Sequence, residues 1–360
     1  MKKIQKILFF VLAVFLLFAC TRENPMPDPP RPSVPLIIFD TDIGSSTDDL
    51  FAMQMLYHYA SQGRCQLLGV VVDRMGDTNA VVADIMNNYY GFPTLPLALE
   101  RNGTYNRYAF INYTPIAQFT DDEGNLMFDR TYSDYSVLPD GYVLYRRLLA
   151  RAPDHSVTIM LTGIPSTIAN LLTSDADQYS TLSGVELVRR KVKRLYFMAT
   201  KLTLDGEQNA STGYNIAMHP EAASTLFDLW PDDVDIILSP SAAGDAVDYA
   251  PEMVISDINW TDIHPLKQIY MHYDCNTGQR MWDPMLPIQE IEGEGTFALS
   301  PRGHLTLTND GHVNFTYDPK GNCRYQMPGD EAWAQRMLNL IRASNRCGNI
   351  STKQSLPTNL

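Results

Sequence analysis

The sequence predicts an α/β fold with a layered, mostly parallel sheet, flanking helices and a small β-hairpin appendage near the C-terminus. Short apolar runs typical of buried strands alternate with segments of helical pattern, which favours parallel β-α-β units. The expected strands are 34–39, 66–72, 156–161, 193–198 and 234–238, and the expected helices are 48–62, 76–91, 138–151, 164–173 and 219–229. In such a Rossmann-like sheet, ligands bind beyond the carboxyl ends of the strands.

The last part of the chain has a different pattern. Residues 296–318 alternate in strand fashion, and two glycine-containing turn signals, at 301–303 and 309–311, interrupt them, which predicts the hairpin. Residues 329–344 are expected to form a closing helix. No boundary divides 35–345, so we expect one domain there, followed by a tail at 346–360.

The first twenty residues are distinct from the rest. Three lysines precede an apolar run from Ile7 to Phe18, and Leu17-Phe18-Ala19-Cys20 resembles a bacterial lipobox. The pattern predicts a signal peptide cleaved before Cys20 and a lipid on the Cys20 thiol. The protein would then be an exported lipoprotein anchored to a bacterial membrane, at the periplasmic face or the cell surface. A transmembrane anchor is the alternative, although the run is short for a span of about 20 residues. The proline-rich segment 21–34 is expected to be an extended tether.

Acidic residues outnumber basic ones. The chain has 28 Lys and Arg against 41 Asp and Glu, and residues 1–20 hold three Lys and no acid, so the mature chain has 25 against 41, or −16. Such a surface repels phosphates, so we expect no nucleic-acid partner. The cysteine spacing shows no zinc pattern. Cys323 and Cys347 are the first pair to consider for a disulfide, because they flank one short segment.

Four carboxylates crowd the segment FDTDIGSSTDDL, residues 39–50: Asp40, Asp42, Asp48 and Asp49. Like charges at close range repel, and a hard divalent cation with oxygen ligands would offset the repulsion. Capping of the next helix would explain one of Asp48 and Asp49, but not all four acids. A solvated acidic loop fits poorly between two apolar runs. The sequence therefore predicts a cation site in this segment.

The segment DTDIGSSTDDLFAM, which begins at Asp40, resembles the motif D-x-D-P-G-x-D-D-A of the inosine-uridine preferring nucleoside hydrolase family, without its proline and with two extra residues. The segments VTIMLTGIPSTIANL (157–171), YFMAT, GYNIAMHPEAA and RMWDP (280–284) resemble later motifs of that family in the same order. The resemblance covers about 35–290, and the later hairpin resembles extensions of bacterial relatives.

The resemblance implies an N-glycosyl hydrolase that cleaves ribonucleosides or related ribosides with the help of calcium. It implies a Ca²⁺ ion held by Asp42, Asp49, the backbone carbonyl of Thr162, and Asp283, with hydroxyls of the ribose completing the shell. Asp42 would also be the general base that activates a metal-bound water.

The same resemblance assigns roles around the ion. Asp48 and Asn215 would bind sugar hydroxyls, and Asp40 would support the ligands from behind. Relatives often form dimers or tetramers, so a homo-oligomer is a possible partner state.

The sequence also departs from the family pattern. Gly213 stands where the family has a glutamate that holds the 5′-hydroxyl, and Glu207 or Asn209 on the preceding loop are candidates to replace it. Trp282 stands where one branch has a histidine; it would either stack on the base or be a core aromatic. Three residues after the second expected strand are further candidates for substrate contact: Asp73, Arg74 and Asn79.

Two other functions stay open. A D-x-D after an apolar strand also opens haloacid-dehalogenase-type phosphatases, with Asp40 as nucleophile and Asp42 as acid/base. That family has Thr or Val where Gly44 stands, and it gives no role to Asp283. The second alternative is a non-catalytic sugar- or nucleoside-binding lipoprotein on the same fold, which the glycine at 213 favours.

Overall fold

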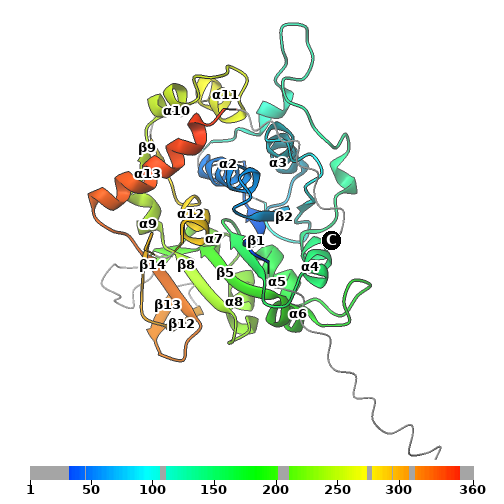
Figure 1. The fold of residues 1–360 in the computed structure, drawn as a ribbon. Helices are drawn as coiled ribbons and strands as arrows, with labels where there is room; N and C mark the ends of the chain where they lie inside the picture. Colours follow the sequence, from blue (N-terminus) through cyan, green and yellow to red (C-terminus); the bar gives the residue numbers. More distant parts are fainter. Residues whose placement is uncertain are drawn as a thin grey trace, which may run out of the picture. The chain divides into compact units, whose positions relative to one another are not determined.

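A central sheet of ten strands, counted over the described residues, organises the domain (Figure 1). The computed structural model describes residues 32–44, 46–105, 111–201, 211–273, 278–293, 295–307 and 313–348. The chain divides into two units, Met1–Arg31, which lies outside the described residues, and Pro32–Leu360, to which all the following refers. No helix within the described ranges is long and apolar enough to cross a membrane.

The strands of the main sheet run in the order β13-β12-β14-β8-β5-β4-β1-β2-β3, with β11 paired to β14. They are β1 (Leu36–Thr41), β2 (Gln66–Val72), β3 (Leu97–Leu99), β4 (Val157–Leu161), β5 (Val192–Met198), β8 (Asp235–Ser239), β11 (Ala298–Leu299), β12 (Gly303–Leu307), β13 (Val313–Tyr317) and β14 (Cys323–Met327). From β14 to β3 all neighbours are parallel. Two short pairs lie outside this sheet: β6 (Thr200–Lys201) with β7 (Ser211–Thr212), and β9 (Asp248–Tyr249) with β10 (Gln279–Arg280).

Helices cover both faces of the sheet (Figure 1). One face packs against α2 (Asp48–Ser61), α3 (Asp77–Tyr89), α10 (Pro251–Asp257), α11 (Pro265–His272), α12 (Met285–Glu292) and α13 (Glu331–Arg346). The other face packs against α4 (Gly141–Arg151), α5 (Ser166–Leu172), α6 (Gly184–Lys191) and α8 (Pro220–Leu229). The remaining helices are short: η1 (Thr114–Gln118), η2 (Tyr135–Val137), α7 (Tyr214–Met218) and α9 (Ser241–Asp245).

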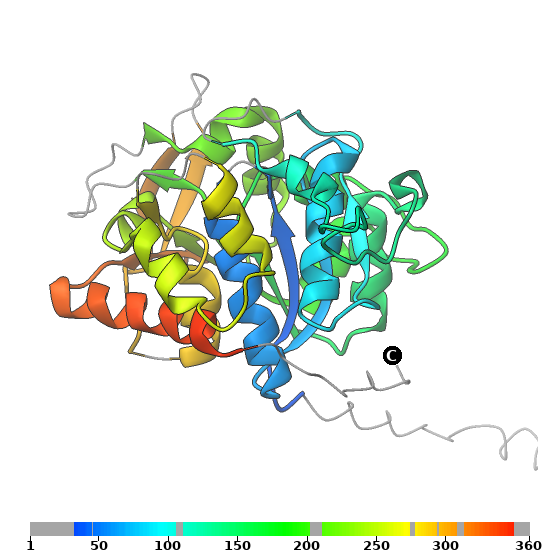
Figure 2. The same ribbon diagram turned by 90° about the horizontal axis from the view of Figure 1, so that it is seen from above.

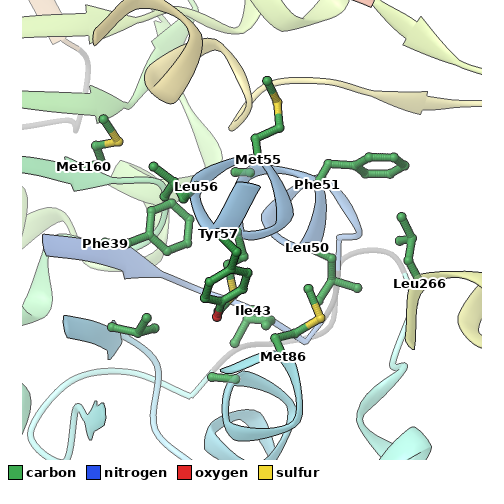
Figure 3. Close-up of a cluster of buried hydrophobic side chains, with 14 of the residues drawn as sticks. Phe39, Ile43, Leu50, Phe51, Met55, Leu56, Tyr57, Met86, Met160 and Leu266 are labelled. Atoms are coloured by element: carbon green, nitrogen blue, oxygen red, sulfur yellow. The ribbon is translucent and has the colours of Figure 1, made fainter. Parts of the chain in front are cut away.

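Helix α2 is buried along almost its whole length. Its sequence is apolar on all sides, which is the pattern of a helix enclosed by other elements. Phe51 and Met55 point away from the sheet, whereas Leu56 lies against Phe39 of β1 (Figure 3). Figure 2 shows α2 alongside β1. Because it is packed on every side, α2 fixes the acids at its first turn beside the carboxyl end of β1.

The expected strands and helices are present, with ends that differ by a few residues. The hairpin is confirmed as β12 and β13, and the structure adds that it continues the main sheet through β14. The sequence pattern did not reveal β14, because this strand has only five residues and polar side chains interrupt its apolar ones. The considered disulfide is wrong, since Cys323 is buried in β14 and free, and Cys347 is exposed and free.

His264, which precedes α11, is fully buried among aromatic side chains. Its Nε2 lies 2.9 Å from the hydroxyl of Tyr90. Burial, with a smaller contribution from the charge of Lys267, lowers the pKa of His264 to about 3. In the unfolded chain this histidine therefore binds a proton near pH 6.5, whereas in the folded chain it stays neutral at that pH. The resulting stability is present above pH 6.5 and is lost as the pH falls below it.

We predict that His264 makes the domain acid-sensitive. Between pH 7.5 and 5 this one histidine should lower the free energy of unfolding by about 2 kcal/mol. His264→Gln keeps a polar side chain facing Tyr90 without a titrating group, so denaturant unfolding of this variant should lose that part of the pH dependence. His272→Gln, at an exposed histidine of the same helix, is the control and should behave as wild type. Equal pH slopes in His264→Gln and wild type would refute the assignment.

Candidate active site

Parallel pairing gathers polar residues from three strands at one edge of the sheet. β1 lies between β2 and β4, with Asp40 opposite Val71 on one side and Leu161 on the other. The residues that follow these strands therefore emerge together, and the backbone N–H of Thr162 donates to the carbonyl of Asp40 at 2.8 Å. This carboxyl edge is where the sequence predicted the ligand site.

A tight turn brings the chain back from β1 into α2. Gly44 has a φ of +130°, and a Cβ at this position would overlap the side chain of Asn79. Its N–H donates to the hydroxyl of Tyr113 at 2.8 Å, and that hydroxyl donates to the carbonyl of Ser46 at 2.8 Å. The turn thus needs glycine, and Tyr113 holds it closed.

Three carboxylates converge beyond this turn. Asp48 and Asp49 lie in the first turn of α2, and Asp283 directly precedes the Pro284 cap of α12. One oxygen from each lies within 4.8 Å of the other two, and all three residues are buried. The hydroxyl of Thr41 donates to Asp49, which further fixes the group.

Burial and mutual repulsion raise the pKa of these acids. The pKa of Asp48 rises to about 7, chiefly because of burial and then because of the charge of Asp42. Burial raises the pKa of Asp49 and of Asp283 well above the usual range, and neighbouring carboxylates add to it. Three oxygen donors with surplus negative charge in one buried place are the ligands that a hard divalent cation requires, so the residues fit a metal ion of this kind.

Asp42 lies beside this group, but its carboxylate is turned towards an arginine. Nη2 of Arg74 donates to Oδ2 of Asp42 at 2.9 Å. Asp42 still lines the cavity described below. The structure therefore brings two of the predicted carboxylate ligands, Asp49 and Asp283, into one cluster with Asp48, and it places Asp42 next to them with one oxygen already paired.

The fourth predicted ligand is a backbone oxygen. The carbonyl of Thr162 accepts a hydrogen bond from Nδ2 of Asn215 at 2.6 Å. The same amide nitrogen donates to the carbonyl of Met198 at 2.8 Å. Because Nδ2 donates to both carbonyls, Asn215 is held at the cavity wall, where its Oδ1 can accept a hydrogen bond from a ligand.

A cavity of about 310 Å³ opens over the acidic group. Its lining includes the four acids Asp42, Asp48, Asp49 and Asp283, together with Met198, Lys201, Gly213, Tyr214, Ser241, Asp245 and Trp282. Trp282 is partly exposed to this cavity, and its indole N–H donates to Asp245 at 2.9 Å. Gly244 lies directly against Trp282, and a Cβ there would overlap it. Trp282 is thus a wall of the cavity and not a core residue.

Several other predicted residues lie away from the cavity. Asp40 is behind the site, where its Oδ2 accepts from the hydroxyl of Tyr145 at 2.8 Å, as a supporting residue would. Asp73, Arg74 and Asn79 are buried and do not line the cavity. Two further candidates, Glu207 and Asn209, fall outside the described residues.

The sequence analysis missed part of the cavity lining. Tyr214 stands in the motif GYNIAMHPEAA, next to Asn215, but was not named as a candidate. Lys201 and Asp245 stand outside the quoted motifs, and the only signal was that they follow β5 and β8 along the chain.

Residues 37–286 match the model of a family described as inosine-uridine preferring nucleoside hydrolase. The chain belongs to this family. The match removes the ground for the phosphatase alternative. A search of curated protein sequences found no significant match.

Solved structures share the fold, among them two nucleoside hydrolases and an effector protein. The inosine-uridine preferring nucleoside hydrolase from Bacillus anthracis has a TM-score of 0.62 and 14% identity, over 87% of this chain and 99% of its own. The purine-preferring ribonucleoside hydrolase from Gardnerella vaginalis has a TM-score of 0.61 and 14% identity, over 86% of this chain and 99% of its own. The type III effector protein XopQ complexed with adenosine diphosphate ribose has a TM-score of 0.60 and 14% identity, over 89% of this chain and 96% of its own.

We predict that a divalent cation stabilises this nucleoside hydrolase domain, and more so at pH 8 than at pH 5. In the metal-free protein the raised pKa of Asp48 gives stability that is present at low pH and lost as the pH rises through about 7. A bound cation replaces the protons, so its effect is larger where they are absent. Calcium at 100 times its Kd should add about 2.7 kcal/mol to the free energy of unfolding.

Thermal unfolding with EDTA and with calcium measures this effect. Asp49→Asn and Asp283→Asn keep the shape of the side chains and should abolish the gain. Asp318→Asn, on the loop after β13, is the matched control and should keep it. Identical melting temperatures of the wild type with and without calcium at both pH values would exclude a cation site in this cluster.

Proposed function

We propose that this protein hydrolyses the N-glycosidic bond of ribonucleosides or related ribosides with the help of calcium. One observation carries the proposal: three buried carboxylates converge beside Asp42 at the end of a cavity that belongs to a nucleoside hydrolase domain. The acids in the lining suit a cation and a polyol, and Trp282 and Tyr214 add aromatic side chains.

The ligands that we assign to calcium are Asp49, Asp283, the free oxygen of Asp42 and the carbonyl of Thr162. Asp49 and Asp283 already belong to the convergent group, and the hydrogen bond from Asn215 leaves the Thr162 carbonyl a second lone pair. When bound, the ion orients the sugar hydroxyls and makes the attacking water more acidic.

Asp42 is the group that we assign as general base. It lines the cavity, and Arg74 leaves its Oδ1 available, so that one lone pair of Oδ1 would face the ion and the other would take a proton from water. Asp48 and Asn215, which also line the cavity, are the residues that we assign to bind sugar hydroxyls. The anomeric carbon becomes positive as the bond to the base breaks, and the surrounding carboxylates stabilise that charge.

The base of the substrate would occupy the end lined by Trp282 and Tyr214. Both rings border the cavity, and aromatic faces bind a planar heterocycle by stacking. The hydrogen bond to Asp245 fixes the plane of Trp282. The ADP-ribose in the XopQ structure supports a substrate range that includes ribosides other than free nucleosides.

A second candidate is riboside binding without turnover. It is favoured by Gly213, which lines the cavity at the position where the resemblance implies a substrate-holding glutamate. The two functions share the metal site and differ only in turnover.

We also propose that the domain is anchored to a bacterial membrane by a lipid at Cys20, at the periplasmic face or the cell surface. The support is the sequence pattern of residues 1–20 and the proline-rich segment that follows it.

The activity prediction is tested with purified residues 21–360, ribonucleosides and p-nitrophenyl riboside, by measuring released sugar. Release should require calcium and fall at least about 100-fold in Asp42→Ala, because a general base contributes roughly 10²–10⁴-fold. Asp318→Asn should leave the rate unchanged. Tight riboside binding with no release in the wild type would reject hydrolysis and favour the second candidate.

The anchoring prediction is tested in cells. Wild-type protein should partition into the detergent phase of Triton X-114 extracts and incorporate labelled palmitate, whereas Cys20→Ser should do neither. Cys65→Ser changes a buried cysteine of the domain and serves as control. Retention of the membrane fraction by Cys20→Ser would favour an uncleaved transmembrane anchor.

A further inference from the structure

Arg74 is a fully buried arginine directly after β2. Nη2 donates to Asp42, while Nε and Nη1 have no hydrogen-bond partner among the described residues. Burying a guanidinium with unused donors costs free energy, so this position is not explained by stability alone. Arg74 does not line the cavity and cannot touch a substrate there.

The electrostatic setting makes Arg74 unusual. Six buried carboxylates surround the carboxyl edge: Asp40, Asp42, Asp48, Asp49, Asp73 and Asp283. Over the described residues, Arg74 makes the one ion pair in which any of these six takes part. Its charge is directed to Asp42 and not to the group of three that faces the cavity centre.

This contact fixes how Asp42 presents its carboxylate. With Oδ2 held by Arg74 at 2.9 Å, rotation of the side chain is restricted and only Oδ1 is left for the cavity. We propose that Arg74 is a positioning residue that limits Asp42 to one oxygen at the cavity, and thereby keeps it a base instead of a two-oxygen metal ligand. The inference rests on the proposed function, because it assigns a role within that reaction.

The proposal predicts opposite effects on metal binding and on turnover. Removal of Arg74 takes a positive charge away from the cation site and frees Oδ2 of Asp42, so calcium should bind more tightly. The same removal lets Asp42 rotate away from the attacking water, so kcat should fall while KM changes little. A purely structural arginine would weaken both binding and turnover when removed.

Arg146 provides a matched control. It is also fully buried, and its Nε pairs with Asp177 at 2.8 Å, but it lies in α4 and holds the loop that follows α5. Arg146→Met therefore removes a buried, paired arginine without touching the cavity. It should lower the melting temperature and leave the calcium Kd and kcat within about twofold of wild type.

The experiment compares wild type with Arg74→Met, Arg74→Lys and Arg146→Met. Calorimetric titration with calcium should give a Kd about tenfold lower in Arg74→Met. Its kcat should fall about 100-fold, which is the loss that a misplacement of about 1 Å can cause. Arg74→Lys keeps the charge and one donor, so its calcium Kd should stay near wild type and part of kcat should return.

A third measurement does not need substrate or a loaded enzyme. Metal-free Arg74→Met lacks the one cation paired within the acidic group, so its melting temperature should fall further below wild type in EDTA than in calcium. Arg146→Met should lose the same amount in both conditions. This readout decides the proposal even if no tested riboside is cleaved.

Two outcomes would overturn the proposal. Weaker calcium binding in Arg74→Met, or values indistinguishable from those of Arg146→Met, would show that Arg74 does not position Asp42. These results would leave the proposed hydrolase standing, provided that wild type binds calcium and turns over. A wild type that binds no calcium would overturn the proposed function together with this inference.

Discussion

Six carboxylates buried at one edge of a sheet repel one another, and only positive charge can offset that repulsion. All six are buried, and apart from the cavity that four of them line, the packing of β1 between β2 and β4 and of α2 on every side keeps water away. Protons, the guanidinium of Arg74 or a bound cation must therefore neutralise the excess. The hydroxyl of Thr41 donates to Asp49 but does not change the total charge.

The fold could be predicted from the sequence wherever the signal was local. Buried strands and helices differ in the period of their apolar residues, and the acidic turn after β1 stands between two apolar runs. The insertion of β14 beside β8 could not be predicted, because it depends on pairing between segments far apart in the chain. The same limit hid Lys201, Tyr214 and Asp245, which meet only after the sheet is assembled.

The site shows a finer limit. Asp42, Asp49 and Asp283 could be named from motif resemblance, and the structure places all three at one cavity. Motif spacing does not determine which oxygen of a carboxylate faces which neighbour. That choice depends on Arg74, which stands two residues after β2, and the family resemblance assigns no role to an arginine at this position. Asp48 joined the convergent group for a similar reason, since its orientation is set by Ser46 and by the backbone N–H of Asp283.

The position of β14 has a consequence for how the chain folds. β8 is left as an open edge of the parallel sheet until β14 pairs with it, and β14 lies near the C-terminal end of the sequence. Helix α13, which follows β14, packs over α2. The segment that follows β13 therefore completes both the sheet and the cover of its central helix. A growing chain cannot close this domain before β14 and α13 have been synthesised, and until then it exposes a pairing-competent strand that favours aggregation or chaperone binding.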